Sequence, residues 1–233
     1  MNDAADVIAD AKRHGRAALD EAAGKRLLAT FGISVPKSVV VADARGATEA
    51  LKQLHPPYVV KLISPDILHK SDAGGVKVNL KESSEVVNAI AEMAAAPHIK
   101  SARIDGYLIE EMAPPGQEIV IGAVRDPDFG PLVMVGLGGI FVEILADVAF
   151  RICPITRLDA EEMLAELKGG AILDGARGKR PVSRAAIVDS LIKIAGEDGL
   201  LMRHGDDFSE ADINPLIVSE AGAVAVDARF ILS

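Results

Sequence analysis

Residues Val59–Leu80 read VVKLISPDILHKSDAGGVKVNL. The segment Tyr58–Ile63 is β-branched and apolar except for Lys61, which predicts a buried strand that carries one functional cation. Ser64–Gly75 contains Pro, Asp, Ser and a Gly-Gly pair, a composition typical of a loop. Val76–Leu80 then alternates like a second strand. The stretch therefore predicts two strands joined by a loop, with a lysine held in place by the first strand.

The lysine and the loop together suit a phosphate group. A lysine on a strand is a fixed cation, and the Gly74-Gly75 turn allows backbone N–H groups to approach phosphate oxygens closely. His69 lies in the same loop, and imidazole is the side chain best suited to accept a phosphoryl group reversibly near neutral pH. The residue types alone leave other interpretations open, namely a hairpin whose lysine reaches solvent and a solvated loop histidine.

The rest of the chain alternates between helical and extended patterns. Helical spacing predicts helices over Ala17–Phe31, Ala47–Leu54, Val86–Ala94, Ala160–Leu167 and Ile187–Ala195. Further strands are predicted at Ser38–Val41, Gly106–Met112, Glu118–Val124, Pro131–Leu137, Asp212–Val218 and Ala223–Ala228. This order indicates a mixed α/β or α+β protein.

Composition narrows the class of protein. The 233 residues suffice for one large domain or two small subdomains, and with 49% hydrophobic residues they can bury a sizeable core. The net charge of −9 argues against nucleic acid as a default partner. One cysteine, Cys153, excludes a disulfide framework and fits a reducing compartment, and it is interpreted as a small buried hydrophobe. The start of the chain lacks a signal-peptide pattern, and no run approaches about 18 apolar residues, so we expect a cytoplasmic protein.

Two further groups of residues could handle a nucleotide. Glu110, Glu111 and Met112 lie on an extended segment whose backbone could hold an adenine edge, and the carboxylate of Glu118 could hold ribose hydroxyls. A surface strand with solvated glutamates explains the same residues.

The second group lies near the end of the chain. Asn214, within DINPL, and Asp227 offer an amide oxygen and a carboxylate that could bind Mg²⁺ together with nucleotide phosphates. Arg229 could contact a phosphate or pair with an acidic neighbour. Asn-Pro is also a common turn former, which leaves a purely structural interpretation open.

Taken in order, these stretches resemble the ATP-grasp subunit of ADP-forming acyl-CoA synthetases, the β subunit of acetate–CoA ligase (ADP-forming). The resemblance runs from about Leu19 to Phe230 and is more distant for the β subunit of succinyl-CoA synthetase. The resemblance rests on four stretches: VVKLISPDILHKSDAGGVKVNL, GQEIVIGAVRDPDFGPLVMVGLGGIFVEILADVAFRICPI, LKGGAILDGARGKRP and ADINPLIVSEAGAVAVDARF.

The resemblance implies an ATP-grasp fold, with the nucleotide between a smaller subdomain of about residues 28–105 and a larger one of 1–27 plus 106–233. It also implies roles for most of the candidate residues. Lys61 would contact nucleotide phosphates, and the hinge Glu110, Glu111 and Met112 would lie against adenine. Glu118 would bind ribose, Asn214 and Asp227 would bind Mg²⁺, and His69 would relay phosphate to ADP. The residue types alone add Gly74, Gly75 and Arg229 as candidates for the phosphates.

The implied activity is that of an acid–thiol ligase. It would interconvert acyl-CoA, ADP and phosphate with carboxylic acid, ATP and CoA, using ATP or ADP and Mg²⁺. A larger CoA-binding α subunit would complete the enzyme as a heterotetramer and handle the acyl-CoA. One alternative is a non-catalytic nucleotide-sensing module, like the synthetase-like regions attached to some protein acetyltransferases. Another is an ATP-grasp ligase acting alone, which predicts a substrate pocket within this chain.

Overall fold

The strands predicted at Tyr58–Ile63 and Val76–Leu80 form with the expected bounds in the computed structural model, which describes residues 3–67, 70–139, 145–175 and 180–233. They are β3 and β4, and they pair antiparallel with Lys61 opposite Val76. The chain divides into two compact units. Unit 1 comprises Met1–Val35 and Pro114–Ser233, and unit 2 comprises Pro36–Ala113.

Unit 2 is a four-stranded sheet in the order β2-β5-β3-β4, with helices packed on one face. Its other elements are β2 (Ser38–Val41), α3 (Ala44–Ala50), the 3₁₀ turn η1 (Leu51–Gln53), α4 (Ser83–Ala95), α5 (Pro97–Lys100) and β5 (Gly106–Glu111). Successive side chains of a strand point to opposite faces. Tyr58, Val60 and Leu62 enter the core with residues of α3 and α4, so Lys61 lies on the other face of the sheet.

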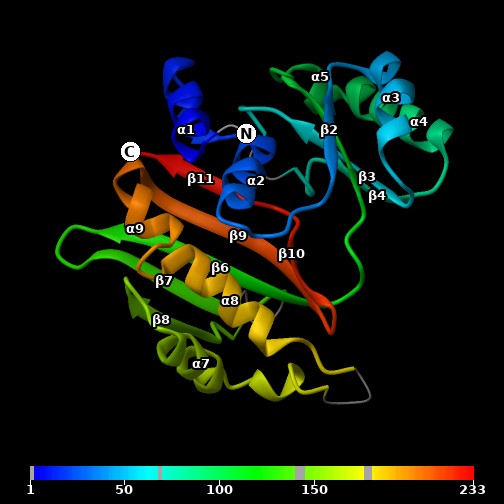
Figure 1. The fold of residues 1–233 in the computed structure, drawn as a ribbon. Coiled ribbons are helices and arrows are strands. Elements are labelled where there is room, and N and C mark those ends of the chain that lie inside the picture. Colours follow the sequence, from blue (N-terminus) through cyan, green and yellow to red (C-terminus); the bar gives the residue numbers. More distant parts are fainter. Residues whose placement is uncertain (1–2, 68–69, 140–144, 176–179) are drawn as a thin grey trace. The chain divides into compact units, whose positions relative to one another are not determined.

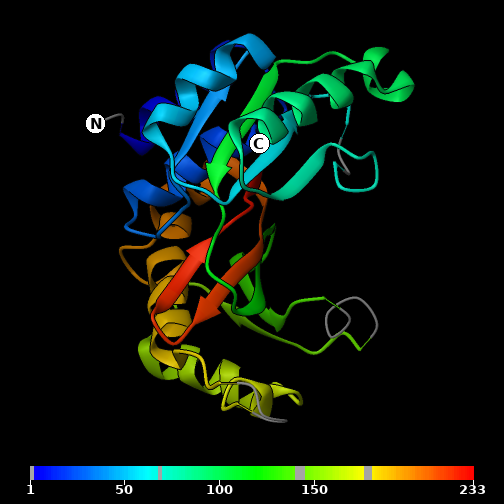
Figure 2. The same ribbon diagram turned by 90° about the vertical axis from the view of Figure 1, so that its right-hand side faces the viewer.

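Unit 1 contains a seven-stranded sheet among its described residues, in the order β1-β11-β9-β6-β7-β8 with β10 beside β9. Figures 1 and 2 show α8 and α9 along one face of this sheet. The elements are α1 (Ala4–Arg13), β1 (Ala18–Leu19), α2 (Glu21–Thr30), β6 (Gln117–Asp126), β7 (Gly130–Leu137), β8 (Val148–Ile152), α7 (Arg157–Glu166), η2 (Gly170–Ile172), α8 (Arg184–Ala195), α9 (Leu200–His204), η4 (Gly205–Asp207), β9 (Phe208–Ser219), β10 (Gly222–Ala225) and β11 (Arg229–Leu232).

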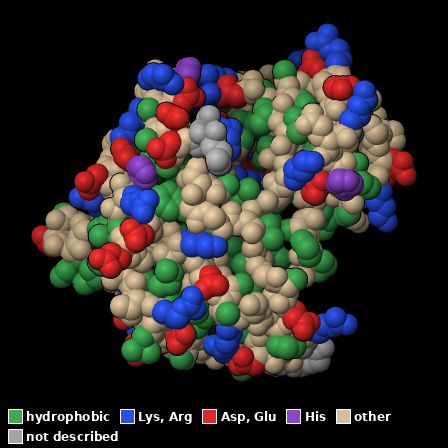
Figure 3. All heavy atoms as spheres, in the orientation of Figure 1, with side chains coloured by type: hydrophobic (Ala, Val, Ile, Leu, Met, Phe, Trp, Pro, Cys, Tyr) green, Lys and Arg blue, Asp and Glu red, His purple; other side chains and the backbone are tan. Residues whose placement is uncertain are grey.

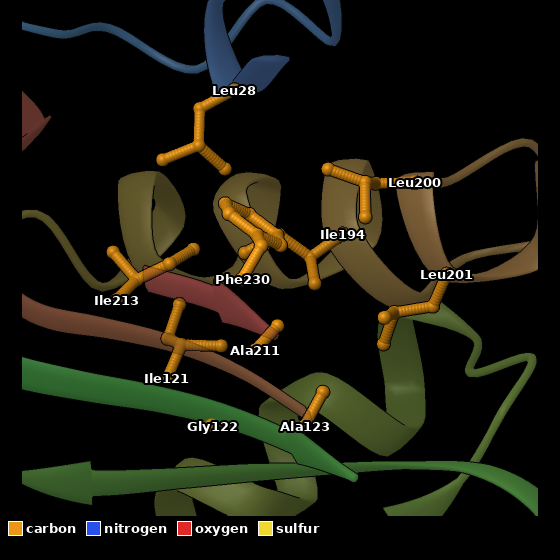
Figure 4. Close-up of a pocket in the computed structure, with 10 residues that line it drawn as sticks. All are labelled: Leu28, Ile121, Gly122, Ala123, Ile194, Leu200, Leu201, Ala211, Ile213 and Phe230. Atoms are coloured by element: carbon orange, nitrogen blue, oxygen red, sulfur yellow. The ribbon is translucent and has the colours of Figure 1, made fainter. Parts of the chain in front are cut away.

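The core of unit 1 lies between the sheet and its helices. Figure 4 shows how side chains of α2, α8 and α9 meet alternate residues of β6, β9 and β11, among them Leu28, Ile194, Ile121 and Phe230. The space they leave is about 10 Å³, lined by apolar groups. A space of this size and lining is a packing gap of the core, too small and too apolar for a ligand.

Among the described strands every pairing is antiparallel, which makes the mixed fold α+β. The predicted helix from Ala17 was wrong at its start. The side chain of Asp20 accepts a hydrogen bond from the N–H of Ala23 and caps α2, so the helix begins at Glu21. Ala18–Leu19 instead pair with β11 as β1.

The predicted strand Ala223–Ala228 was also wrong over its second half. β10 ends at Ala225, and the N–H of Val226 donates to the carbonyl of Pro215, which turns the chain out of the hairpin. The chain then re-enters the sheet as β11 from Arg229, on the far side of β9 from β6. Helix α1 and strand β8 were not predicted.

The boundaries between the units differ from those expected at 28–105. Leu28 and Ile33 belong to the hydrophobic core of unit 1, so the chain enters unit 2 only at Pro36. Strand β5 lies between β2 and β3 in the sheet of unit 2, so the chain leaves unit 2 only after Ala113.

Two predictions about single features can be compared with the structure. Cys153 is buried in unit 1, and burial raises the pKa of its thiol to about 11, which fits a packing residue and not a nucleophile. In the part of the chain that the structure describes, no helix is long and apolar enough to cross a membrane. On the face shown in Figure 3, basic and acidic side chains are interspersed.

Candidate functional site

In unit 2, Lys61 is held by a buried carboxylate. The Nζ atom of Lys61 lies 2.8 Å from Oε1 of Glu110, and the two residues are 7% and 1% exposed. β3 and β5 pair with Val59 opposite Glu110, so the lysine and the glutamate are diagonal neighbours on one face of the sheet. A buried ammonium group requires such a partner, because its desolvation would otherwise cost several kcal/mol. The strand thus fixes the cation as predicted, and Glu110 takes part through its side chain.

The predicted adenine hinge uses its backbone donors within unit 2. The N–H of Glu111 donates to the carbonyl of Lys37 at 2.9 Å, and the N–H of Met112 donates to the carbonyl of Pro57 at 2.8 Å. The carboxylate of Glu111 accepts from the N–H and from Nδ1 of His55, and the bond to the imidazole lowers the pKa of this carboxyl. These two N–H groups are therefore not free to donate to an adenine. An adenine at this hinge would have to replace these hydrogen bonds or donate to backbone carbonyls.

The Gly74-Gly75 pair shapes a turn. The N–H of Gly74 donates to Ser71, and that of Gly75 donates to Lys70 at 2.7 Å, so both donors are used by their own loop. Gly74 has a φ of +67°, which favours glycine, and a Cβ on Gly75 would lie 3.1 Å from the carbonyl oxygen of Lys70. Both N–H groups are therefore already used here, and a phosphate would have to replace these two hydrogen bonds to bind them. His69 lies outside the described residues.

In unit 1, the predicted residues lie on the strands of the larger sheet. Glu118 and Arg229 are each next to a buried core residue along their strands, so they lie on the face opposite the helices. Asn214 is exposed and lies in β9 where its register with β6 shifts. In the register of β11 and β9, Arg229 lies opposite Asp212. The N–H of Val226 donates to the carbonyl of Pro215. These two links hold the connection that carries Asp227 alongside the segment of β9 that carries Asn214.

Asp212 is the residue that the sequence interpretation missed. Its pKa is raised, first by burial and then by the negative charges of Asp227 and Glu210, while the guanidinium of Arg229 acts in the opposite direction. The spacing of Asp212 and Asn214 by two residues in the predicted strand was the available signal, because residues two apart on a strand share a face.

This donor set fits Mg²⁺. In the described ranges, no group of three or more His, Cys, Asp or Glu side chains forms a complete metal site. Mg²⁺ needs less, since it is held by one or two carboxylates and completes its shell with water and phosphate oxygens. Burial is the main cause of the raised pKa of Asp212, and the negative charge of Asp227 adds to it; a divalent cation would relieve this second contribution.

Glu118 is fitted tightly to a glycine pair. The N–H of Gly138 donates to the carbonyl of Glu118 at 2.8 Å, and a Cβ on Gly138 would lie only 2.7 Å from the Cβ of Glu118. Gly139 has a φ of +64°, and its Cβ position is 3.9 Å from Oε2 of Glu118. Any side chain at residue 138 would therefore displace Glu118.

The chain belongs to the ATP-grasp family, whose ATP-grasp domain model matches residues 10–232. It is 44% identical over 231 residues to the β subunit of acetate–CoA ligase [ADP-forming] I of Pyrococcus furiosus, covering 98% of this chain and 97% of that protein.

Two solved structures have the same fold over the whole length. An acetyl-coenzyme A synthetase 1 from Ca. Korarchaeum cryptofilum, in complex with coenzyme A and Ca-AMPCP, is 41% identical with a TM-score of 0.91, covering 98% of this chain and 99% of that one. The same synthetase with coenzyme A and Mg-AMPPCP is 40% identical with a TM-score of 0.84, covering 99% of this chain and 100% of that one. In the second, a phosphohistidine segment points towards the nucleotide binding site.

The contact between Gly138 and Glu118 generates a prediction. Gly138→Ala should weaken the binding of ADP about 10-fold, because the new methyl group pushes Glu118 out of its position. Isothermal titration in the presence of Mg²⁺ measures this, with Glu118→Ala and the double variant beside it. The double variant should lose no more affinity for ADP than either single variant, because each of the three lacks a correctly placed Glu118 carboxylate.

Gly46→Ala is the matched control, since its Cβ would meet Val41 at an ordinary 3.4 Å. A folded Gly138→Ala protein with wild-type affinity for ADP would show that this glycine does not place Glu118 for binding.

Proposed function

We propose that this chain is the nucleotide-binding subunit of an ADP-forming acyl-CoA synthetase. It takes part in the interconversion of acyl-CoA, ADP and phosphate with carboxylic acid, ATP and CoA. The observation that carries the proposal is the end-to-end match to the β subunit of an acetate–CoA ligase, at 44% identity over 98% of this chain. The same match favours a catalytic subunit over the nucleotide-sensing alternative.

The proposed roles follow from charge and position. Lys61 and Arg229 neutralise nucleotide phosphates, Glu118 binds ribose hydroxyls, and the hinge at Glu110, Glu111 and Met112 lies against adenine. Asn214 and Asp227 hold Mg²⁺, with Asp212 beside them; when bound, the ion supplies further charge neutralisation. Phosphoryl transfer is well served by such a site, since it depends on positioning and charge neutralisation more than on covalent chemistry.

His69 supplies the covalent step. A ring nitrogen of His69 attacks the phosphorus of an acyl phosphate formed on the partner chain, the bond from phosphorus to the carboxyl oxygen breaks, and the carboxylate leaves. A terminal oxygen of ADP then attacks the same phosphorus, the nitrogen–phosphorus bond breaks, and ATP is formed with the imidazole restored. The reverse sequence phosphorylates His69 from ATP.

A second chain is needed for the rest of the reaction. The relatives named β subunits imply an α partner. We propose that a larger CoA-binding α subunit forms and uses the acyl phosphate, and that the two chains assemble as a heterotetramer. The sites for the acid and for CoA then lie mainly in the partner.

The relay role of His69 is tested by His69→Ala in the complex with the α subunit. ATP formation from acyl-CoA, ADP and phosphate should fall at least about 1,000-fold, because the nucleophile of a covalent route is lost. The change should be in kcat, with the KM for ADP within about 2-fold, since the imidazole does not bind the nucleotide. Near-normal turnover in this variant would refute the relay.

The proposed magnesium site generates a separate prediction. Asn214→Ala and Asp227→Ala should each weaken the binding of Mg-ADP about 10-fold to 100-fold, because each removes one of few protein ligands. Binding of ADP in the presence of EDTA should change little and serves as the control. Unchanged affinity for Mg-ADP in both variants would exclude these residues as ligands.

A further inference from the structure

The connection between β3 and β4 is fixed at its start by two polar side chains. The Oγ of Ser64 donates to the carbonyl of Arg103 at 2.7 Å, and Oδ2 of Asp66 accepts from the N–H of Arg103, also at 2.7 Å. The N–H of Asp66 donates to Ser64 Oγ at 3.1 Å and joins the two side chains to each other. Both backbone polar groups of Arg103 are therefore used to hold the beginning of this connection.

An apolar contact continues the attachment. Ile67 is partly buried against the hydrophobic core of unit 2. Ile104, which follows Arg103 in the chain, is partly buried against the same core. A half-buried isoleucine gains free energy only while it stays on that core, so it opposes movement of the chain away from the unit.

A histidine holds the far end of the same connection. Nε2 of His98, in α5, lies 2.6 Å from the carbonyl oxygen of Ala73. A carbonyl oxygen only accepts, so this ring nitrogen carries the proton and donates. The N–H groups of Gly74 and Gly75 bond within the turn and fix its shape, whereas the His98 bond attaches the turn to a different part of the unit.

One short segment, residues 98–105, thus holds the connection at both of its ends. The side chains of Asp66 and His98 are exposed. Exposed hydrogen bonds contribute little net stability, because water replaces them readily. What they do supply is a defined position, and an error of about 1 Å in the placement of a reacting group can lower a rate about 100-fold.

We propose that Asp66 and His98 are positioning residues for phosphoryl transfer, acting by fixing both ends of the connection between β3 and β4. The inference rests on the proposed function, in which this connection carries the phosphate relay. It adds residues whose side chains bind neither nucleotide nor metal.

The test uses four variants in the complex with the CoA-binding subunit. Asp66→Ala and His98→Ala remove the two contacts. Asp66→Asn keeps an oxygen to accept from Arg103, and His98→Gln keeps an N–H to donate to Ala73. His14→Ala is the matched control, because Nδ1 of that exposed histidine contacts the carbonyl of Asp10 at 2.8 Å at the C-terminal end of α1, in unit 1.

Each alanine variant should lower kcat for ATP formation about 10-fold and the double variant about 100-fold, while the KM for ADP stays within about 2-fold. The Asn and Gln variants should stay within about 3-fold of the wild-type kcat, and His14→Ala should match wild type. The inference is overturned if the double variant turns over normally, or if the conservative variants lose as much as the alanine ones.

Amide hydrogen exchange separates this inference from the proposed function. The amides of Lys70–Gly75 should exchange at least about 10-fold faster in His98→Ala than in wild type, whatever reaction the protein catalyses. If the wild-type complex forms no ATP, the proposed function fails, and unchanged exchange would overturn the attachment itself. Faster exchange with an unchanged kcat would also overturn the positioning role.

Discussion

Lys61 and Glu110 form a buried ion pair, and keeping this pair restricts how the strands of unit 2 can be arranged. The carboxylate must come from the strand beside β3, in a register that places Val59 opposite Glu110. A slip of one residue would turn Lys61 into the apolar core, where its charge would have no partner. The position of Lys61, which is proposed to contact nucleotide phosphates, therefore depends on the correct register of the sheet.

In unit 1, the charged groups around Asp212 are mainly acidic. The pKa of Asp212 is raised mainly by burial and further by the negative charges of Asp227 and Glu210, while Arg229 acts in the opposite direction. The antiparallel pairing of β9 and β11 holds this arrangement in place. Unit 2 thus holds one cation in a fixed place on its sheet, and unit 1 holds a cluster of oxygen donors on its own sheet.

The sequence was sufficient where a pattern was local. β2, β3 and β4 were predicted with their observed bounds, because each combines β-branched residues with flanking turn signals. It was insufficient where the partner is distant in the chain. The backbone N–H groups of Glu111 and Met112 donate to the carbonyls of Lys37 and Pro57. The spacing of residues along the sequence does not predict these contacts. The expected boundaries of the units differ from the observed ones for the same reason. They depend on which hydrophobic core contains Leu28 and on which strands pair with β5.

The most direct measurement of the central claim is the transfer of labelled phosphate to this chain. The complex with the CoA-binding subunit would be incubated with Mg²⁺ and ATP labelled in its terminal phosphate, and the two chains would then be separated. The account predicts an acid-labile, base-stable label on a peptide of this chain that contains His69, and its loss as labelled ATP on addition of ADP. ATP formation at the normal rate, with no label on this chain at any time, would contradict it.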